Sequence, residues 1–177
     1  MNKLDYKQKR ADCLFGKKGE EASLSHLRSL FGNKNVYQYD YKYCPMDFYL
    51  QEEGEAVGDA GIHLREFEVK SRRVKFGFYP DYAFGENKIV KAKKKLEMGI
   101  PTTFIFNLTD GFYYWNFDEN TKSIEYREGM ICNIARNDTP HKSLFIKKPY
   151  ITKMDNFNPK RNLDDNYHKK QIVVDFT

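Results

Sequence analysis

The stretch IHLREFEVKSR, residues 62–72, alternates between charged and apolar side chains over its second half. Successive side chains of a β-strand project from opposite faces, so Glu68 and Lys70 share one face while Phe67 and Val69 share the other. The pattern predicts a strand that carries an acid and a base side by side and buries its opposite face. A solvated surface pair is the alternative.

Two further strands are predicted upstream, at residues 44–50 (CPMDFYL) and 35–42 (NVYQYDYK). The polar, glycine-rich residues 51–61 then form a loop that closes a hairpin with the next strand. Asp47 is an unusual residue for simple packing, because apolar side chains flank it on both sides. If the strands pair, Asp47 meets Glu68, and two carboxylates can bind a hard cation between them. Otherwise Asp47 is an acid on an edge strand.

Residues 17–31 (KKGEEASLSHLRSLF) predict an amphipathic helix, because Leu24, Leu27 and Phe31 recur at helical spacing. Glu20 precedes them by four, seven and eleven residues and therefore projects from the same apolar face. A carboxylate directed inward costs several kcal/mol unless it is paired or bound to a metal ion. The simpler alternative is that Glu20 opens the helix, where the macrodipole favours an acid.

Residues 86–98 (ENKIVKAKKKLEM) predict a second helix with one apolar face. Four lysines gather on its opposite face, where they suit phosphate groups or plain solubility: Lys88, Lys91, Lys94 and Lys95. The aromatic loop before this helix contains Tyr79, Tyr82 and Phe84. Such side chains can stack on bases, but we favour packing of the loop onto the core.

The almost continuously apolar residues 102–108 predict a strand covered on both sides, and 112–117 predict another. Weaker strand candidates follow at 123–127 and 143–147, and residues 156–170 are typical of a loop or tail. The order of elements predicts an α/β fold with a central mixed sheet flanked by helices.

The 177 residues suit one principal domain, and the net charge of +5 suits a polyanionic partner. The N-terminus lacks the apolar core of a signal peptide, and no run of about 18 apolar residues is present. We therefore expect a soluble, cytoplasmic protein without membrane contact. The three cysteines form no CxxC pair and the four histidines show no ligand spacing, which argues against structural zinc. No GxxxxGK[ST] loop occurs, so no nucleotide cofactor is expected.

A helical Glu20, a strand Asp47 and Glu68-Val69-Lys70 on the next strand, in this order, resemble the PD-(D/E)XK nuclease superfamily of restriction-endonuclease-like and Holliday-junction-resolvase-like enzymes. The resemblance covers about residues 17–117 and implies that family's αβββαβ core. Met46 stands where the motif has proline. The literal Pro80-Asp81 follows the E-x-K and is in the wrong order.

The resemblance implies a metal-dependent deoxyribonuclease. Asp47, Glu68, the backbone carbonyl of Val69 and Glu20 would bind Mg²⁺ or Mn²⁺, and Lys70 would orient the attacking water. The lysines of the second helix would contact DNA phosphates, and Arg72 and Arg73 would extend that basic strip.

Three regions are thus predicted: an N-terminal segment at 1–16, the nuclease core at 17–117, and a β-rich extension with a polar tail at 118–177. The extension is a reasonable place for homodimer or DNA contacts. We expect an endonuclease, because the chain is compact. The alternatives are a non-catalytic DNA-binding module that retains the fold and, within the superfamily, a Holliday junction resolvase.

Overall fold

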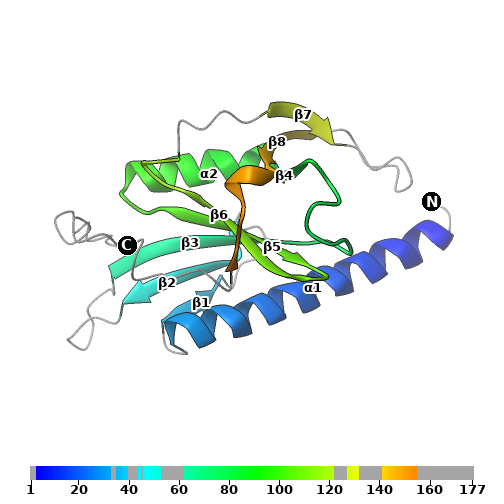
Figure 1. Cartoon of the computed structure of the whole chain (residues 1–177). Helices are drawn as coiled ribbons and strands as arrows, with labels where there is room; N and C mark the ends of the chain where they lie inside the picture. Colours follow the sequence, from blue (N-terminus) through cyan, green and yellow to red (C-terminus); the bar gives the residue numbers. More distant parts are fainter. Residues whose placement is uncertain are drawn as a thin grey trace.

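The central element is a six-stranded mixed sheet between two helices (Figure 1). The computed structural model describes residues 3–32, 35–39, 44, 46–52, 62–121, 127–131 and 141–154. The strand order of the sheet is β1 (Val36–Gln38), β2 (Phe48–Glu52), β3 (Ile62–Ser71), β5 (Thr102–Leu108), β6 (Gly111–Phe117) and β9 (Thr152–Lys153). β3 and β5 run parallel, and the other neighbours in this sheet pair antiparallel. The predicted α/β class and mixed sheet are confirmed.

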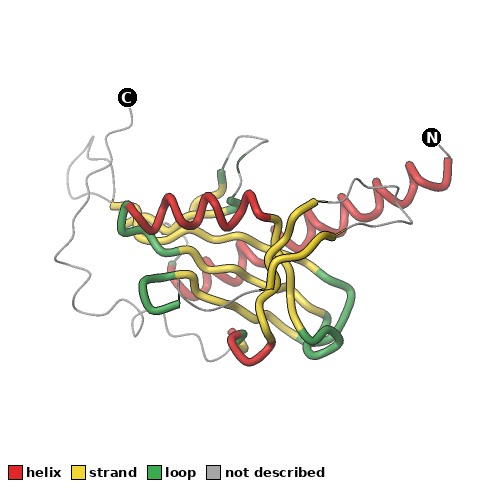
Figure 2. The backbone as a smooth tube through the Cα atoms, turned by 90° about the horizontal axis from the view of Figure 1, so that it is seen from above, coloured by secondary structure: helices red, strands yellow, loops and turns green. Residues whose placement is uncertain are grey.

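The second sheet is smaller and contains β4 (Asp81–Gly85), β8 (His141–Lys147) and β7 (Arg127–Ile131), in that order. Helix α1 (Lys3–Phe31) covers one face of the central sheet, while α2 (Glu86–Glu97) and the small sheet lie over the other (Figures 1 and 2). The 3-10 helix η2 (Lys148–Tyr150) leads from β8 towards β9. Within the described residues, no helix is long and apolar enough to span a membrane.

Helix α1 is longer than the sequence predicts, because it begins at Lys3 rather than at residue 17. The apolar periodicity starts only near residue 17, but residues 3–16 contain no proline and are mostly good helix formers. The added half projects beyond the sheet (Figure 1). Arg73, which follows β3, donates to Asp12 Oδ1 at 2.9 Å and places its guanidinium 4.2 Å from the Phe15 ring centroid.

The core consists of two clusters, one on each face of the central sheet. The cluster under α1 includes Leu27, Phe67 and Ile105. The cluster under α2 and the small sheet includes Phe104 and Trp115, together with residues of β4 and β8. The strand predicted at 102–108 is therefore buried on both faces, which confirms that prediction.

β4 is a strand that the sequence analysis missed, since its residues were assigned to an aromatic loop. Tyr82 and Phe84 are buried, at 3% and 1% exposure, and Tyr82 pairs with Ile146 of β8. The packing preferred for these two side chains is confirmed, but it is wrong for Tyr79, which is 42% exposed. A five-residue strand between a glycine- and proline-containing loop and a helix depends on a partner from far along the chain, which local propensity does not reveal.

The other strands differ from the prediction mainly in their bounds. Of the stretches predicted at 35–42 and 44–50, the described residues form β1 and β2, and Asp47 precedes its strand instead of lying inside it. Residues 40–42 and 45 of these stretches lie outside the described residues. β2 and β3 form the predicted antiparallel hairpin. Strands near both weaker candidates are present as β7 and β8. Residues 53–61 of the hairpin loop, 123–126, and 155–177, with the predicted tail, lie outside the described residues.

Candidate active site

The site begins where β3 continues beyond the end of β2. The last registered pair is Phe48 with Phe67, whereas β3 extends to Ser71. The Asp47 backbone N–H donates to the Phe67 carbonyl at 3.0 Å, and the Asp47 Oδ2 accepts from the Val69 N–H at 2.7 Å. The carboxylate of Asp47 thus satisfies a strand N–H that β2 no longer reaches. Because both backbone polar groups of a strand residue point to the same side, the Val69 carbonyl is directed towards this open edge as well.

β3 has the alternation that its sequence predicts. Phe67 and Val69 lie in the core cluster under α1, whereas Glu68 and Lys70 belong to the face towards α2. Asp47 is bonded to Phe67 and Val69, the residues before and after Glu68, and its charge acts on the Glu68 carboxyl. The second and third acidic positions of the predicted site are therefore neighbours.

Glu68 is the most strongly perturbed carboxyl of the site. Its side chain is 5% exposed, and Lys88 Nζ of α2 lies 2.7 Å from its Oε2. Burial, and then repulsion from the Asp47 charge, raise the pKa of Glu68 to about 8 despite the attraction of Lys88 and Lys70. Removing a carboxylate from water next to another carboxylate disfavours its ionised form, and a bound cation reverses that preference.

Glu20 reaches the same place from α1. Its neighbour Gly19 is buried against β3, where an added Cβ would lie 2.8 Å from the Ser71 Cβ. The Gly19 carbonyl accepts from Asn107 Nδ2 of β5 at 3.3 Å, which helps to fix this turn of the helix on the sheet. Burial, and then the Asp47 charge, raise the pKa of Glu20, while Lys88 lowers it. Asp47 therefore acts electrostatically on both glutamates.

Lys70 is partly buried at the same edge. Desolvation and then Arg72 lower the pKa of its ammonium group, while Glu68 and Asp47 act in the opposite direction. A lysine whose charged form is destabilised in this way gives up its proton more readily than an exposed lysine. Asp47 thus interacts electrostatically with each of the other three predicted residues, Glu20, Glu68 and Lys70.

The lysines of α2 do not form the single exposed face that was predicted. Lys88 and Lys95 turn towards β3, where Lys95 Nζ lies 2.7 Å from Glu66 Oε1. Lys91 is half-buried, and only Lys94 of the four is exposed. A helical wheel reports which residues share a face, but the direction of that face depends on how the helix lies over the sheet.

The predicted arginine strip is also divided. Arg72 is partly buried, and its Nη1 lies 3.4 Å from the Ser71 carbonyl. Arg73 is exposed and directed to α1 through Asp12. Arg73 therefore links the projecting half of α1 to the end of β3. The sequence did not suggest this contact.

A second polar cluster lies one step along β3 and was not predicted. Glu66 is fully buried, and its Oε1 accepts from the Tyr39 hydroxyl at 2.7 Å and pairs with Lys95. His63 Nε2 lies 3.6 Å from the same oxygen, but burial and then Lys95 lower the pKa of His63 to about 4, so it is neutral at pH 7. The signal was the spacing E-x-E-x-K, which puts Glu66, Glu68 and Lys70 on one face.

The oxygen atoms available to a hard cation are the carboxylates of Asp47 and Glu68 and the Val69 carbonyl. Across the described ranges, no group of three or more His, Cys, Asp or Glu side chains is arranged to hold a metal ion. The Lys88 ammonium instead provides a positive charge at Glu68. The donor types and the raised pKa of Glu68 fit Mg²⁺ or Mn²⁺, with a backbone carbonyl as the third protein ligand.

No family model, curated protein or solved structure matches this chain.

Proposed function

We propose that this protein is a metal-dependent deoxyribonuclease, and more specifically an endonuclease. The observation that carries the proposal is the convergence of Glu20, Asp47, Glu68 and Lys70 at the open edge of β3, where two acids have raised pKa values and the lysine has a lowered one. Burying these groups together costs stability, and such clusters of perturbed ionisable groups are typical of functional sites. The sequence resemblance to the PD-(D/E)XK superfamily supports the same conclusion.

Asp47, Glu68 and the Val69 carbonyl would hold Mg²⁺ or Mn²⁺. When bound, the ion supplies positive charge that stabilises the negative charge developing on a scissile phosphate. Asp47 is already oriented for this role, because its second interaction with the Val69 N–H fixes its carboxylate at the edge of the sheet. Glu68 must lose its proton before it can act as a ligand, so cation binding is coupled to proton release.

Lys70 would orient the attacking water and stabilise charge in the transition state, since its ammonium lies among the same acids. Lys88 Nζ lies 2.7 Å from Glu68 Oε2, and its positive charge would be available to a substrate phosphate. The charges of Asp47 and Lys88 both act on the pKa of Glu20. Glu20 would coordinate the metal ion through water or as a further ligand.

The test is cleavage of a supercoiled plasmid and a synthetic four-way junction with Mg²⁺, Mn²⁺ or EDTA. We expect metal-dependent cutting of closed circular DNA, and a decrease of about 10²- to 10³-fold for Lys70→Ala, as for the loss of one preorganised electrostatic group. Lys142→Ala is the matched control, because Lys142 is exposed and its ion pair is with Glu86 on the surface. Preference for the junction would identify a resolvase.

Salt-sensitive binding of DNA without any cutting would overturn the catalytic proposal. The protein would then be a binding module in which the contact between Lys88 and Glu68 is structural. Gel filtration and sedimentation of the protein alone would show whether it forms a homodimer, the arrangement that cleavage of both strands favours.

A further inference from the structure

The loop between β3 and β4 carries the most exposed large apolar side chain among the described residues. Phe78 is 67% exposed and Tyr79 is 42% exposed, and their rings meet edge to face at 4.9 Å. Tyr150 of η2, at 44% exposure, belongs to the same region, because the adjoining Lys148 N–H donates to the Pro80 carbonyl at 3.3 Å. A soluble protein seldom presents several aromatic side chains together without a binding role.

The loop is held by several contacts next to these rings. Phe76 stacks on the Tyr113 ring at 4.2 Å, and its N–H donates to the Asp110 carboxylate at 2.9 Å. Gly77 has a φ of 87°, and its N–H donates to the Tyr82 hydroxyl at 2.9 Å. Residues before and after Phe78 are thus anchored to the buried sheet. Anchoring lowers the entropy that is lost when a ligand stacks on the ring.

The charges around the rings are mainly positive. Lys75 belongs to the loop, and Lys147 and Lys148 adjoin it; all three are exposed. The Lys148 ammonium lies 3.6 Å from the point where a Cβ on Gly77 would be. The carboxylate of nearby Asp110 accepts hydrogen bonds from the Phe76 N–H and the Tyr113 hydroxyl. Asp81 of β4 pairs in register with Lys147 of β8. Exposed rings flanked by lysines suit a ligand that combines a flat apolar surface with negative charge.

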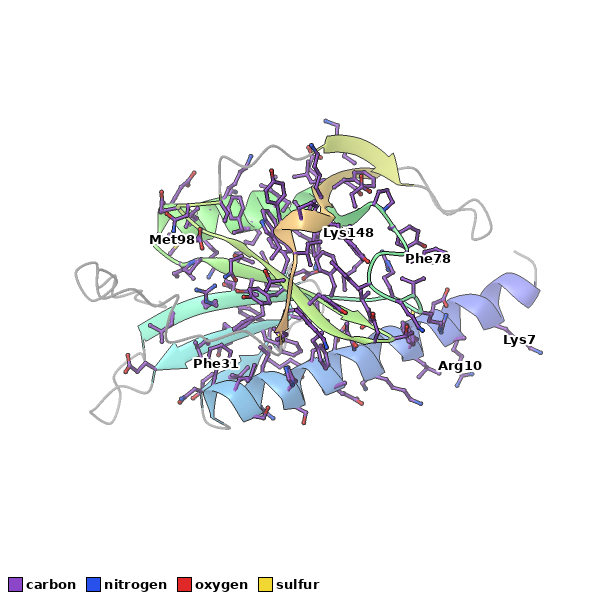
Figure 3. All side chains as sticks on the ribbon, viewed as in Figure 1. Lys7, Arg10, Phe31, Phe78, Met98 and Lys148 are labelled. Carbon is purple, nitrogen blue, oxygen red and sulfur yellow. The ribbon has the colours of Figure 1, made fainter. Side chains whose placement is uncertain are left out.

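The loop with the exposed rings follows the candidate active site directly in the sequence. Its loop leaves β3 directly after Lys70 and Arg72, at the end of the molecule from which the N-terminal half of α1 projects. Figure 3 shows Phe78 at that end, with Arg10 and Lys7 on the projecting helix.

We propose that Phe78 and Tyr79 form a stacking platform for an unpaired nucleic-acid base, with Lys75, Lys147 and Lys148 contacting the adjoining phosphates. This inference rests on the proposed nuclease function and specifies its substrate as DNA that contains a single-stranded or unpaired segment. A base inside an intact duplex is already stacked and offers no face to the platform. Stacking of bases on aromatic side chains is the usual means by which proteins bind single strands.

The test uses single-stranded and duplex oligonucleotides that contain 2-aminopurine, in EDTA so that nothing is cut. We expect the wild-type protein to quench the fluorescence of the single strand and to bind it more tightly than the duplex. Phe78→Ala/Tyr79→Ala should weaken binding of the single strand by about fivefold or more and abolish the quenching. Phe78→Trp should retain both.

Leu30→Ala is the matched control, because Leu30 is a partly exposed apolar residue on α1, near Phe31 at the other end of the molecule (Figure 3). Equal binding of single strand and duplex, or unchanged quenching in the double variant, would overturn the platform. Cleavage assays keep the two proposals separate. Metal-dependent cutting with an unaltered substrate preference in the double variant refutes the platform alone, whereas quenching without cutting refutes catalysis alone.

Discussion

Glu68 is buried beside Asp47, and the pKa of its carboxyl is raised from an ordinary 4.5 to about 8. Between these values the folded protein retains a proton that the unfolded chain has released. The free energy of unfolding therefore decreases as the pH rises through this window, with a slope that approaches about 1.4 kcal/mol per pH unit. The contribution of Glu68 is most favourable below pH 4.5 and is lost by about pH 8.

Substitution of Glu68 by Gln should remove this component. In EDTA, we expect Glu68→Gln to gain stability relative to the wild type as the pH is raised from 5 to 8, because an amide does not ionise. Urea unfolding followed by the fluorescence of Trp115, the single tryptophan, measures the difference at each pH. A difference that does not change with pH would show that Glu68 ionises normally. Excess Mg²⁺ should restore wild-type stability at pH 8.

The relative positions of the site residues could be predicted only where local geometry determines them. Glu68 and Lys70 share a face because strand alternation is a property of the backbone, and Asp47 lies next to Glu68 because β2 and β3 form a hairpin that brings Asp47 to Val69. The orientation of Lys88 and Lys95 towards Glu68 and Glu66 depends on the tertiary placement of α2, which no local pattern contains.

Helix α1 is positioned by one close approach to the central sheet. Gly19 is buried against Ser71, so this turn of the helix lies nearer to β3 than any side chain would allow. Ser23 Oγ also donates to the Gly19 carbonyl at 2.8 Å. Because Glu20 is the next residue, the separation of the two elements determines where its carboxylate lies relative to Asp47.

Replacement of Gly19 by Ala should therefore be destabilising, by about 1–3 kcal/mol, as is usual for overpacking. Gly16→Ala is the matched control in the same helix: a Cβ there meets nothing within 4 Å. That variant should be stabilised by about 0.5–1 kcal/mol, since alanine is the better helix former. Thermal unfolding monitored by circular dichroism compares the two. If both substitutions stabilise, the close approach of α1 to β3 is not tight.

At the scale of elements, the sequence predicted α2, β3, β5 and β6 closely, because each has a long, regular pattern of its own. It missed the first half of α1, which has helix-forming residues but no apolar periodicity. It also missed β4, whose pairing with β8 spans more than fifty residues. The missed segments were thus those without a regular apolar pattern of their own.

The molecule as a whole gathers positive charge at the end where Phe78 is exposed. Exposed basic residues of α1 and of the β3–β4 and β8–η2 regions contribute to it: Lys7, Arg10, Lys17, Lys18, Arg73, Lys75, Lys147 and Lys148. The excess of cations over the chain is only +5, so their arrangement matters more than their number. Clustering of this kind attracts a polyanion to one end of the protein.

Affinity for DNA should consequently depend steeply on salt. We expect log K to decrease linearly with log salt concentration, and each lysine that neutralises a phosphate to contribute about 0.7–0.9 to the slope. Lys147→Ala/Lys148→Ala should reduce the slope by about 1.4–1.8, as measured by fluorescence anisotropy. Lys142→Ala, at the opposite end of the same strand and paired with Glu86, should leave it unchanged. Equal slopes for all three proteins would place the DNA elsewhere.

The parallel pairing of β3 with β5 also bears on the order in which the elements fold. Glu66 pairs in register with Thr102, and the chain between them forms β4 and α2. During synthesis and folding, α1 and the first three strands can associate through nearby contacts, while Glu66 and Glu68 remain hydrated until α2 brings Lys95 and Lys88. We therefore expect α2 to dock late in folding. Removal of either lysine should accelerate unfolding more than it slows folding, so the acids are enclosed only when their counter-charges arrive.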